Sequence, residues 1–418
     1  MFDKIKLFSQ YKGLRKEIYV LFFGRVVTNL GSMVWPMLTM IMNQKLGMNA
    51  STIAIVMVLA SVLLVPANIL GGKLADRYNK KKIIVVFDIL SVICYIICGI
   101  LPLSIATIAL MLLAGVGQNL EGPSYNSLLA DLTTTADREK AYSLMYLGGN
   151  LGLVLSPTIA GLLFKNYLWL SFIISGIAIG ISTLLIAFKI NDITPVRDSS
   201  AESVYQKSRG DVSIFTVLKE NKVVVLFTVT MALYYSAYHQ YTYLMPLDMG
   251  SVHGESGAAL YGTVSSLNCI IVVIFTPIIT KLLSKITSTK KIFIGQGLVM
   301  VGYVLFLAFL GHIPFYYAAM LLFTWGEIIT TISEGPYTSK RIPASHRGRI
   351  NGVSAVLGFA FSSVSELSVG HLYDNSGSTA AWILVIGMVI AAMALTLTLI
   401  RLDRKAYPAL YGQTEENE

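Results

Sequence analysis

The sequence predicts an all-α membrane protein with about twelve transmembrane helices in two pseudo-symmetric six-helix bundles. Three observations predict this fold class. Only 13% of the residues are charged and 55% are hydrophobic, whereas a soluble domain has about 25% charged residues. About twelve apolar runs approach the ~20 residues that a helix needs to cross a bilayer, and continuous runs without a period of two favour helices over a barrel. Finally, features of the first half recur in order in the second half.

The distribution of positive charge orients these helices. Nearly all of the 32 Lys and Arg residues fall in segments on one side of the expected helices, and the segments on the other side hold only Lys45 and Lys165. Loops rich in Lys and Arg stay in the cytoplasm, so we expect both termini to be cytoplasmic. The net charge of +9 therefore reflects topology, and no nucleic-acid partner is expected.

The first half, residues 1–190, is expected to form the N-terminal bundle. Its basic start precedes an apolar run that is too long for a signal-peptide core and lacks a small-residue cleavage site, so we expect this run to remain as the first helix. Pro102 ends the third expected helix. The six helices are expected at about 17–42, 51–70, 83–101, 105–130, 141–164 and 169–188.

A Ser-rich, charged segment, residues 191–221, is the expected cytoplasmic linker. Within it, Val212, Phe215 and Leu218 fit a short amphipathic helix on the membrane surface. Residues 222–402 are expected to form the C-terminal bundle, and residues 403–418 a cytoplasmic tail. The six helices of this bundle are expected at about 223–247, 258–283, 292–310, 315–339, 350–373 and 380–399.

The two halves look like an internal repeat. Glu121-Gly122-Pro123 recurs as Glu334-Gly335-Pro336, and Gly161 recurs as Gly370. Two parallel six-helix halves related by an axis along the membrane normal are a known transporter plan. The repeat therefore favours transport.

The short loop between the second and third expected helices carries the most specific pattern in the chain. It matches the Gly-x-Leu-Ala-Asp-Arg-x-Gly-Arg-Lys loop of the major facilitator superfamily at Gly72, Leu74, Ala75, Asp76 and Arg77, with Asn79 in place of the second glycine and Lys80 and Lys81 as the basic pair. The chain resembles this family over essentially its whole length. The resemblance implies the major facilitator fold, in which two bundles alternate access to a central cavity.

The same loop is expected to form a conformational gate from Gly72, Asp76, Arg77, Lys80 and Asp131. Asp76 can sit at the positive N-terminal end of a helix from the other half. Lys80 can pair with Asp131 at the cytoplasmic end of the fourth helix. Such contacts would hold the cytoplasmic side closed. The alternative is that the charges only anchor the loop among lipid headgroups.

A second pattern lies in the fifth expected helix. Residues 152–161 are similar to the Gly-x-x-x-Gly-Pro-x-x-Gly-Gly motif of the family's drug–proton antiporters at Gly152, Ser156, Pro157 and Gly161. Ser156 replaces a glycine but stays small, so close helix approach survives, and Pro157 is expected to bend the helix. The alternative is generic helix packing. The arginine that these antiporters carry in the fourth helix is missing here.

Ionisable residues inside the membrane are costly and are candidate functional residues. Arg25 in the first helix and Glu121 in the fourth lie at similar depth, so we expect them to pair, either as a structural salt bridge or as one that switches with protonation. Glu366 takes the place of Pro157 in the second half. Asp88 is interpreted as a snorkelling or interfacial acid.

Glu327 and Glu334 are seven residues apart, so they share one face of the tenth expected helix. The sequence Gly326-Glu327-Ile328 resembles a segment of lactococcal-type multidrug–proton antiporters in which the acid takes part in substrate binding or coupling. The resemblance implies this role for Glu327.

The seventh expected helix carries a row of aromatic residues at Tyr234, Tyr238 and Tyr241, with His239 beside them. Facing a cavity, these rings would stack on flat or cationic ligands. The alternatives are packing or a belt at the membrane interface.

These observations predict a secondary active transporter and not an enzyme. The leading hypothesis is proton-coupled efflux of small amphiphilic or cationic compounds of the multidrug type. The alternatives are proton-coupled uptake, export or flipping of a sugar, peptide, metabolite or lipid, and a non-transporting membrane receptor. No phosphate loop or metal-ligand cluster occurs in the sequence, so we expect no metal or cofactor, with protons as the coupling ion. The expected partners are a small-molecule substrate and the lipid bilayer, and the expected form is a monomer in the inner membrane of a bacterium.

Overall fold

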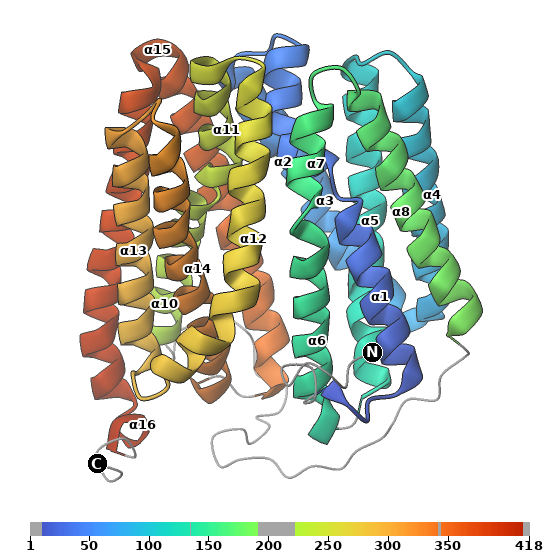
Figure 1. The fold of residues 1–418 in the computed structure, drawn as a ribbon. Coiled ribbons are helices and arrows are strands. Elements are labelled where there is room, and N and C mark those ends of the chain that lie inside the picture. The colour runs from blue at the N-terminus through green and yellow to red at the C-terminus, as the bar shows by residue number, and fades with distance from the viewer. Residues whose placement is uncertain (1–10, 134, 191–221, 342–343, 413–418) are drawn as a thin grey trace. The chain divides into compact units, whose positions relative to one another are not determined.

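The fold is entirely helical in the part of the chain that the structure describes (Figure 1). This structure is a computed structural model, and it describes residues 11–133, 135–190, 222–341 and 344–412. Ten of its helical stretches are long and apolar enough to cross a membrane. The predicted all-α membrane fold class is therefore confirmed. The expected linker 191–221, with its amphipathic helix, lies outside the described residues.

The first half forms a series of long helices with two interruptions. Its elements are α1 (Lys16–Leu30), α2 (Val34–Met40), the π-helical turn η3 (Ile41–Lys45), α3 (Ala50–Arg77), α4 (Lys80–Ile100), α5 (Ile105–Asp131), α6 (Thr135–Leu153), α7 (Ser156–Leu163) and α8 (Leu168–Lys189). Asn79 begins α4, because its side-chain oxygen accepts a hydrogen bond from the Lys82 backbone N–H at 3.1 Å.

Both interruptions fall inside expected membrane helices. The first expected helix breaks between α1 and α2, and the fifth breaks between α6 and α7, just before Pro157. Proline lacks a backbone N–H and clashes with the preceding turn of a helix, so the bend expected at Pro157 is confirmed.

The second half is helical throughout its described residues. Its elements are α10 (Lys222–Tyr238), α11 (Gln240–His253), α12 (Ser256–Leu282), α13 (Ser288–Ala308), α14 (Ile313–Arg341), α15 (Ala344–Ala406) and α16 (Ala409–Gly412). Helix α15 spans 63 residues, but Gly377 divides it into two arms with a φ of 81°. This left-handed conformation favours glycine. The eleventh and twelfth expected helices lie in the two arms.

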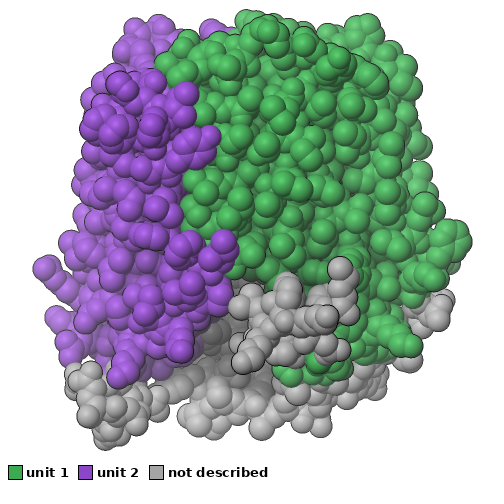
Figure 2. All heavy atoms as spheres, viewed as in Figure 1, with its two compact units in different colours: residues 1–48, 59–200, 249–273 green, residues 49–58, 201–248, 274–418 purple. Residues whose placement is uncertain are grey.

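The chain divides into two compact units, which Figure 2 colours separately. Unit 1 comprises residues 1–48, 59–200 and 249–273, and unit 2 comprises residues 49–58, 201–248 and 274–418. The first turns of α3 therefore belong with unit 2, and most of α12 belongs with unit 1. A core cluster of unit 1 joins α1, α5, α6 and α8 through buried side chains such as Leu21, Leu129, Leu144 and Ile186.

In unit 2, the start of α3 is held by α11 and α15. The Asp374 carboxylate accepts hydrogen bonds from the backbone N–H groups of Ala50 at 3.1 Å and Ser51 at 2.8 Å, which satisfies donors that a helix start leaves free. The Tyr243 hydroxyl donates to the Ala50 carbonyl at 2.6 Å. A Cβ atom at Gly370 would crowd the same carbonyl.

Unit 1 contains the equivalent contact at the start of α12. A Cβ atom at Gly161 of α7 would crowd the Ala258 carbonyl, and the Thr158 hydroxyl bonds to the Ser266 hydroxyl at 2.7 Å. Gly161 and Gly370 are the pair that the sequence repeat predicts. Each lets a helix pack closely against the start of another, so the repeat is present in the packing as well as in the sequence.

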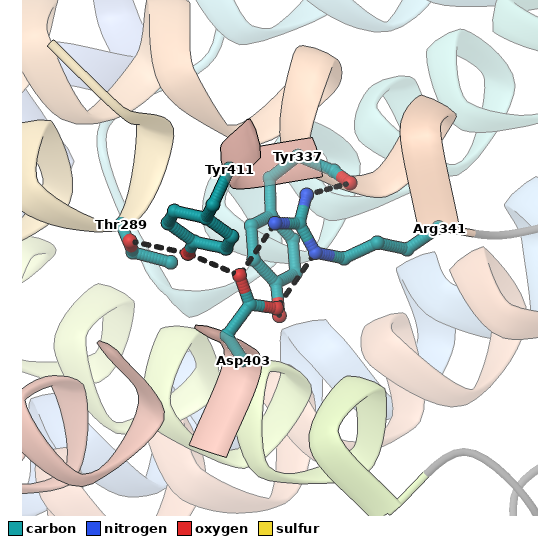
Figure 3. A network of polar contacts seen from close by, with 5 residues as sticks. All are labelled: Thr289, Tyr337, Arg341, Asp403 and Tyr411. Carbon is teal, nitrogen blue, oxygen red and sulfur yellow. Dashed lines mark hydrogen bonds and ion pairs between the residues drawn. The ribbon is translucent and has the colours of Figure 1, made fainter. Parts of the chain in front are cut away.

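A buried network of polar side chains lies within unit 2 (Figure 3). The Asp403 side chain is 0% exposed and that of Arg341 is 6% exposed. Arg341 Nε donates to Asp403 Oδ1 at 2.7 Å, and the hydroxyls of Tyr337 and Tyr411 donate to the same carboxylate at 3.0 and 2.6 Å. Burial lowers the pKa of the Arg341 guanidinium, but the hydrogen bond and the charge of Asp403 raise this pKa. The net shift is upward. The expected tail begins at Asp403, and the structure places this residue inside unit 2.

Candidate functional site

A cavity of about 240 Å³ lies within unit 1, beside the break between α1 and α2. Helices α1, α4, α5 and α8 all contribute to its wall. Its ionisable and amide-bearing lining residues are Arg25, Asn29, Asp88, Tyr95, Gln118 and Glu121. Three charged side chains from three helices therefore face one cavity.

The structure brings Arg25 and Glu121 to the same cavity but not into a direct ion pair. No salt bridge joins them among the described residues. The Arg25 guanidinium lies over the Tyr125 ring, 5.9 Å from its centroid. The Tyr125 hydroxyl donates to the Leu21 carbonyl of α1 at 2.7 Å, so this ring fills the space between α1 and α5. The expected direct pairing of Arg25 with Glu121 is wrong for this reason.

Asp88 is a cavity residue that sequence reasoning missed. It is only 6% exposed, and its Oδ2 accepts a hydrogen bond from the Thr183 hydroxyl of α8 at 2.8 Å. The interpretation of Asp88 as an interfacial acid is therefore wrong. The one signal for this contact in the sequence is a threonine in the sixth expected helix, 95 residues away.

A second group of acids lies in unit 2, between α10 and α14. The Tyr235 hydroxyl donates to Glu334 Oε2 at 2.7 Å. Glu327, two turns away on α14, interacts with the phenol of Tyr238. The shared face predicted for the two glutamates thus lies against the tyrosine-rich helix, and each glutamate meets its own tyrosine.

The tyrosines of α10 and α11 are largely packed against other rings. Tyr238 stacks on Phe323 of α14 at a centroid distance of 5.1 Å, and Tyr241 lies 5.2 Å from the same ring. Tyr234 is 1% exposed. These contacts favour the packing interpretation for Tyr234 and Tyr241. Tyr235, which the sequence pattern did not single out, is the direct partner of Glu334.

Two further candidates lie near this group. His239 occupies the break between α10 and α11, and its ring is inclined by 27° to that of Tyr235, with the ring centroids 6.3 Å apart. Glu366 lies on the first arm of α15, close enough to Tyr243 for its charge to act on that phenol. Glu366 therefore belongs with the contacts around the start of α3 and not with α14.

The predicted ion pair of the loop motif is present in unit 1. Lys80 pairs with Asp131, and both side chains are about one fifth exposed at 23% and 21%. The neighbouring Lys81 Nζ donates to the Ile190 carbonyl at 2.6 Å. The Arg77 guanidinium lies over the Tyr78 ring, and no atom would crowd a Cβ at Gly72. The Asp76 side chain lies outside the described part of the structure.

The fifth-helix motif supplies close packing within unit 1. A Cβ atom at Gly152 would collide with the Val26 carbonyl of α1. Ser156 and Pro157 are buried at the start of α7, and Gly161 meets α12 as described above. Small residues at these positions let the helix backbones approach.

Comparison with known proteins places the chain among transporters. Residues 21–366 match the model of the Major Facilitator Superfamily. The chain is 22% identical over 349 residues to a "Na(+), Li(+), K(+)/H(+) antiporter" of Planococcus maritimus, covering 76% of this chain and 80% of that protein. It is 24% identical over 259 residues to the multidrug resistance protein MdtH of Yersinia pestis, covering 60% of each. Among solved structures, a POT family transporter in complex with 5-aminolevulinic acid superposes with a TM-score of 0.77 at 15% identity, covering 94% of this chain and 97% of that one.

Proposed function

Because this chain belongs to the major facilitator superfamily, we propose that it exports small amphiphilic or cationic compounds in exchange for protons, by alternating access. It is a multi-pass membrane transporter and not an enzyme. We place it in the bacterial inner membrane as a monomer, with both termini in the cytoplasm.

We propose that the chain has twelve membrane helices. Helix α15 counts once among the ten apolar stretches but has two arms separated by Gly377. Helices α10 and α11, with 17 and 14 residues, are each short but follow one another across His239. If the two arms of α15 are counted as two membrane helices, and α10 and α11 together as one, the count supports six helices in each half.

The observation that carries the substrate assignment is the contact between α10 and α14. Glu334 accepts a hydrogen bond from Tyr235, and Glu327 lies against Tyr238. An ionised carboxylate inside the membrane is costly, so each glutamate is stabilised by a bound proton or by a cationic ligand. The surrounding tyrosine and phenylalanine rings favour a cation with apolar surface. Competition between proton and substrate for one carboxylate is a means of exchange.

The loop between α3 and α4 is the proposed gate of this cycle. Lys80 and Asp131 hold α4 to the end of α5. A Cβ atom at Gly71 would collide with the Leu120 carbonyl, so α3 also packs closely on α5, nearer the middle of that helix. Together with Gly72, Asp76 and Arg77, these contacts are proposed to hold the cytoplasmic side closed during one half of the cycle.

Counterflow in liposomes tests this function. Vesicles that contain the purified protein and an unlabelled organic cation are expected to accumulate the labelled cation transiently, whereas empty vesicles are not. The panel also includes a neutral amphiphile, a dipeptide and a sugar. Accumulation of only the dipeptide or only the sugar would contradict the substrate class, and no accumulation of any compound would contradict transport.

A further inference from the structure

We propose that the unit 1 cavity binds one small monovalent cation, for which a proton competes. This inference rests on the proposed function, because exchange with protons gives such a site its use. It concerns a different place from the glutamates of α14. The cavity holds Arg25 of α1, Asp88 of α4 and Glu121 of α5, and Asp88 has no place in the scheme proposed above.

The charge of the cavity favours a monovalent ion. The titratable groups that face it are Arg25 of α1, Asp88 and Tyr95 of α4, and Glu121 and Tyr125 of α5, while the α8 residues that line it are uncharged. With both carboxylates ionised, two negative charges face one guanidinium. A net charge buried in the membrane is costly. One monovalent cation or one proton restores neutrality, whereas a divalent cation would leave an excess positive charge.

One of the two carboxylates has an oxygen that no protein group satisfies in the part of the chain that the structure describes. Glu121 Oε2 is buried and has no hydrogen-bond partner among the described residues. Asp88 is held through Oδ2 by Thr183, which orients the carboxyl group and leaves Oδ1 for the cavity. A buried polar atom without a partner is costly, so Glu121 Oε2 points to a ligand that the protein alone does not supply.

Neutral oxygen atoms complete the coordination. Asn29 donates its amide N–H to the Arg25 carbonyl at 2.9 Å, so its Oδ1 remains available. Gln118 and Ser32 also line the cavity. Carboxylate, amide and hydroxyl oxygens are the ligands that hard cations prefer. The break between α1 and α2 adds an unwound backbone, which coordinates coupling ions in transporters with discontinuous helices.

The size of the cavity also favours an ion. Pockets for drug-sized ligands measure about 300–1,000 Å³, and this cavity of about 240 Å³ is smaller. A water molecule occupies about 30 Å³ in the liquid, so the space fits a cation with a few of its waters. The larger organic substrate is therefore assigned to the acids of α14 and the ion to unit 1.

Trp35 lines the cavity and can report on its occupant. Purified protein in detergent is titrated with NaCl, LiCl or KCl against N-methylglucamine chloride at constant ionic strength, and tryptophan fluorescence is followed. We expect a saturable change for at least one of these ions. The apparent Kd is expected to rise by up to about tenfold for each unit by which the pH falls, because one proton displaces one cation. No response to any of the three ions at alkaline pH would overturn the proposal.

Variants separate this site from the substrate site. The Asp88→Asn variant is expected to lose the cation response, and Asp374→Asn, a matched change in unit 2, to keep it. If Asp88→Asn does not fold, Thr183→Ala removes only the orienting hydrogen bond and is expected to raise the apparent Kd several-fold. A wild-type response in Asp88→Asn or Thr183→Ala would overturn the proposal. Binding of an organic cation is also measured on the wild-type protein. A response to a small cation without binding of the organic cation contradicts the proposed function alone, and binding of the organic cation without a response to any small cation contradicts this inference alone.

Discussion

Replacing Glu327 by glutamine is expected to abolish export that is driven by a pH gradient. Glutamine keeps the size of the side chain and its contact with Tyr238, but it can neither release a proton nor attract a cation. A carboxyl group inside the membrane is the feature on which proton exchange depends. We expect at least about a tenfold loss of dye export from everted vesicles, as a missing proton carrier would cause.

A matched substitution tests whether this effect is specific. Glu255 is an exposed acid that pairs with Lys165 at 2.7 Å, and such surface pairs contribute little to stability. The Glu255→Gln variant is therefore expected to export at close to the wild-type rate. Unimpaired export by Glu327→Gln would contradict the role given to Glu327, whatever the result for the control.

The Asp403→Asn variant is expected to lose a large part of the stability of unit 2. Asp403 is fully buried and faces the almost fully buried Arg341, so the substitution leaves the guanidinium charge buried without a counter-charge. Two tyrosine hydroxyls lose a charged acceptor at the same time. Breaking a buried ion pair costs about 3–5 kcal/mol. Thermal unfolding in detergent should show a clearly lower midpoint than the wild type.

A double variant distinguishes an unpaired charge from a simple loss of contacts. Arg341→Met combined with Asp403→Leu removes both charges and fills much of the same volume. Replacing a buried pair by apolar residues is often nearly neutral, so the double variant is expected to be more stable than Asp403→Asn alone. If the loss of stability in the double variant equals the sum of the losses in the two single variants, the two charges are not coupled.

Features that depend on the order of neighbouring residues and helices along the chain were predictable from the sequence. Lys80 and Asp131 stand at the adjoining ends of two consecutive helices, so their pairing followed from topology alone. Pro157 breaks its helix through its own backbone chemistry. Gly161 and Gly370 occupy repeated positions, and both prove to be close-packing sites.

Contacts between distant segments were not predictable in the same way. Thr183 orients Asp88 across 95 residues, and nothing local to Asp88 distinguishes it from an interfacial acid. Arg25 meets the Tyr125 ring because that ring fills the space between α1 and α5. On α10, Tyr234 and Tyr235 are consecutive, and the rotation of the helix decides which of them reaches Glu334. Each of these outcomes depends on helix packing, which a single sequence does not encode as a short pattern.

We expect the movement of substrate and the movement of protons to be coupled. The most direct measurement is the internal pH of proteoliposomes that contain the purified transporter, recorded while an organic cation is added outside. Exchange predicts that entry of the cation drives protons out, so the interior becomes more alkaline, and that Glu327→Gln removes this change. Uptake of the cation by the wild-type protein without any change in internal pH would contradict the account.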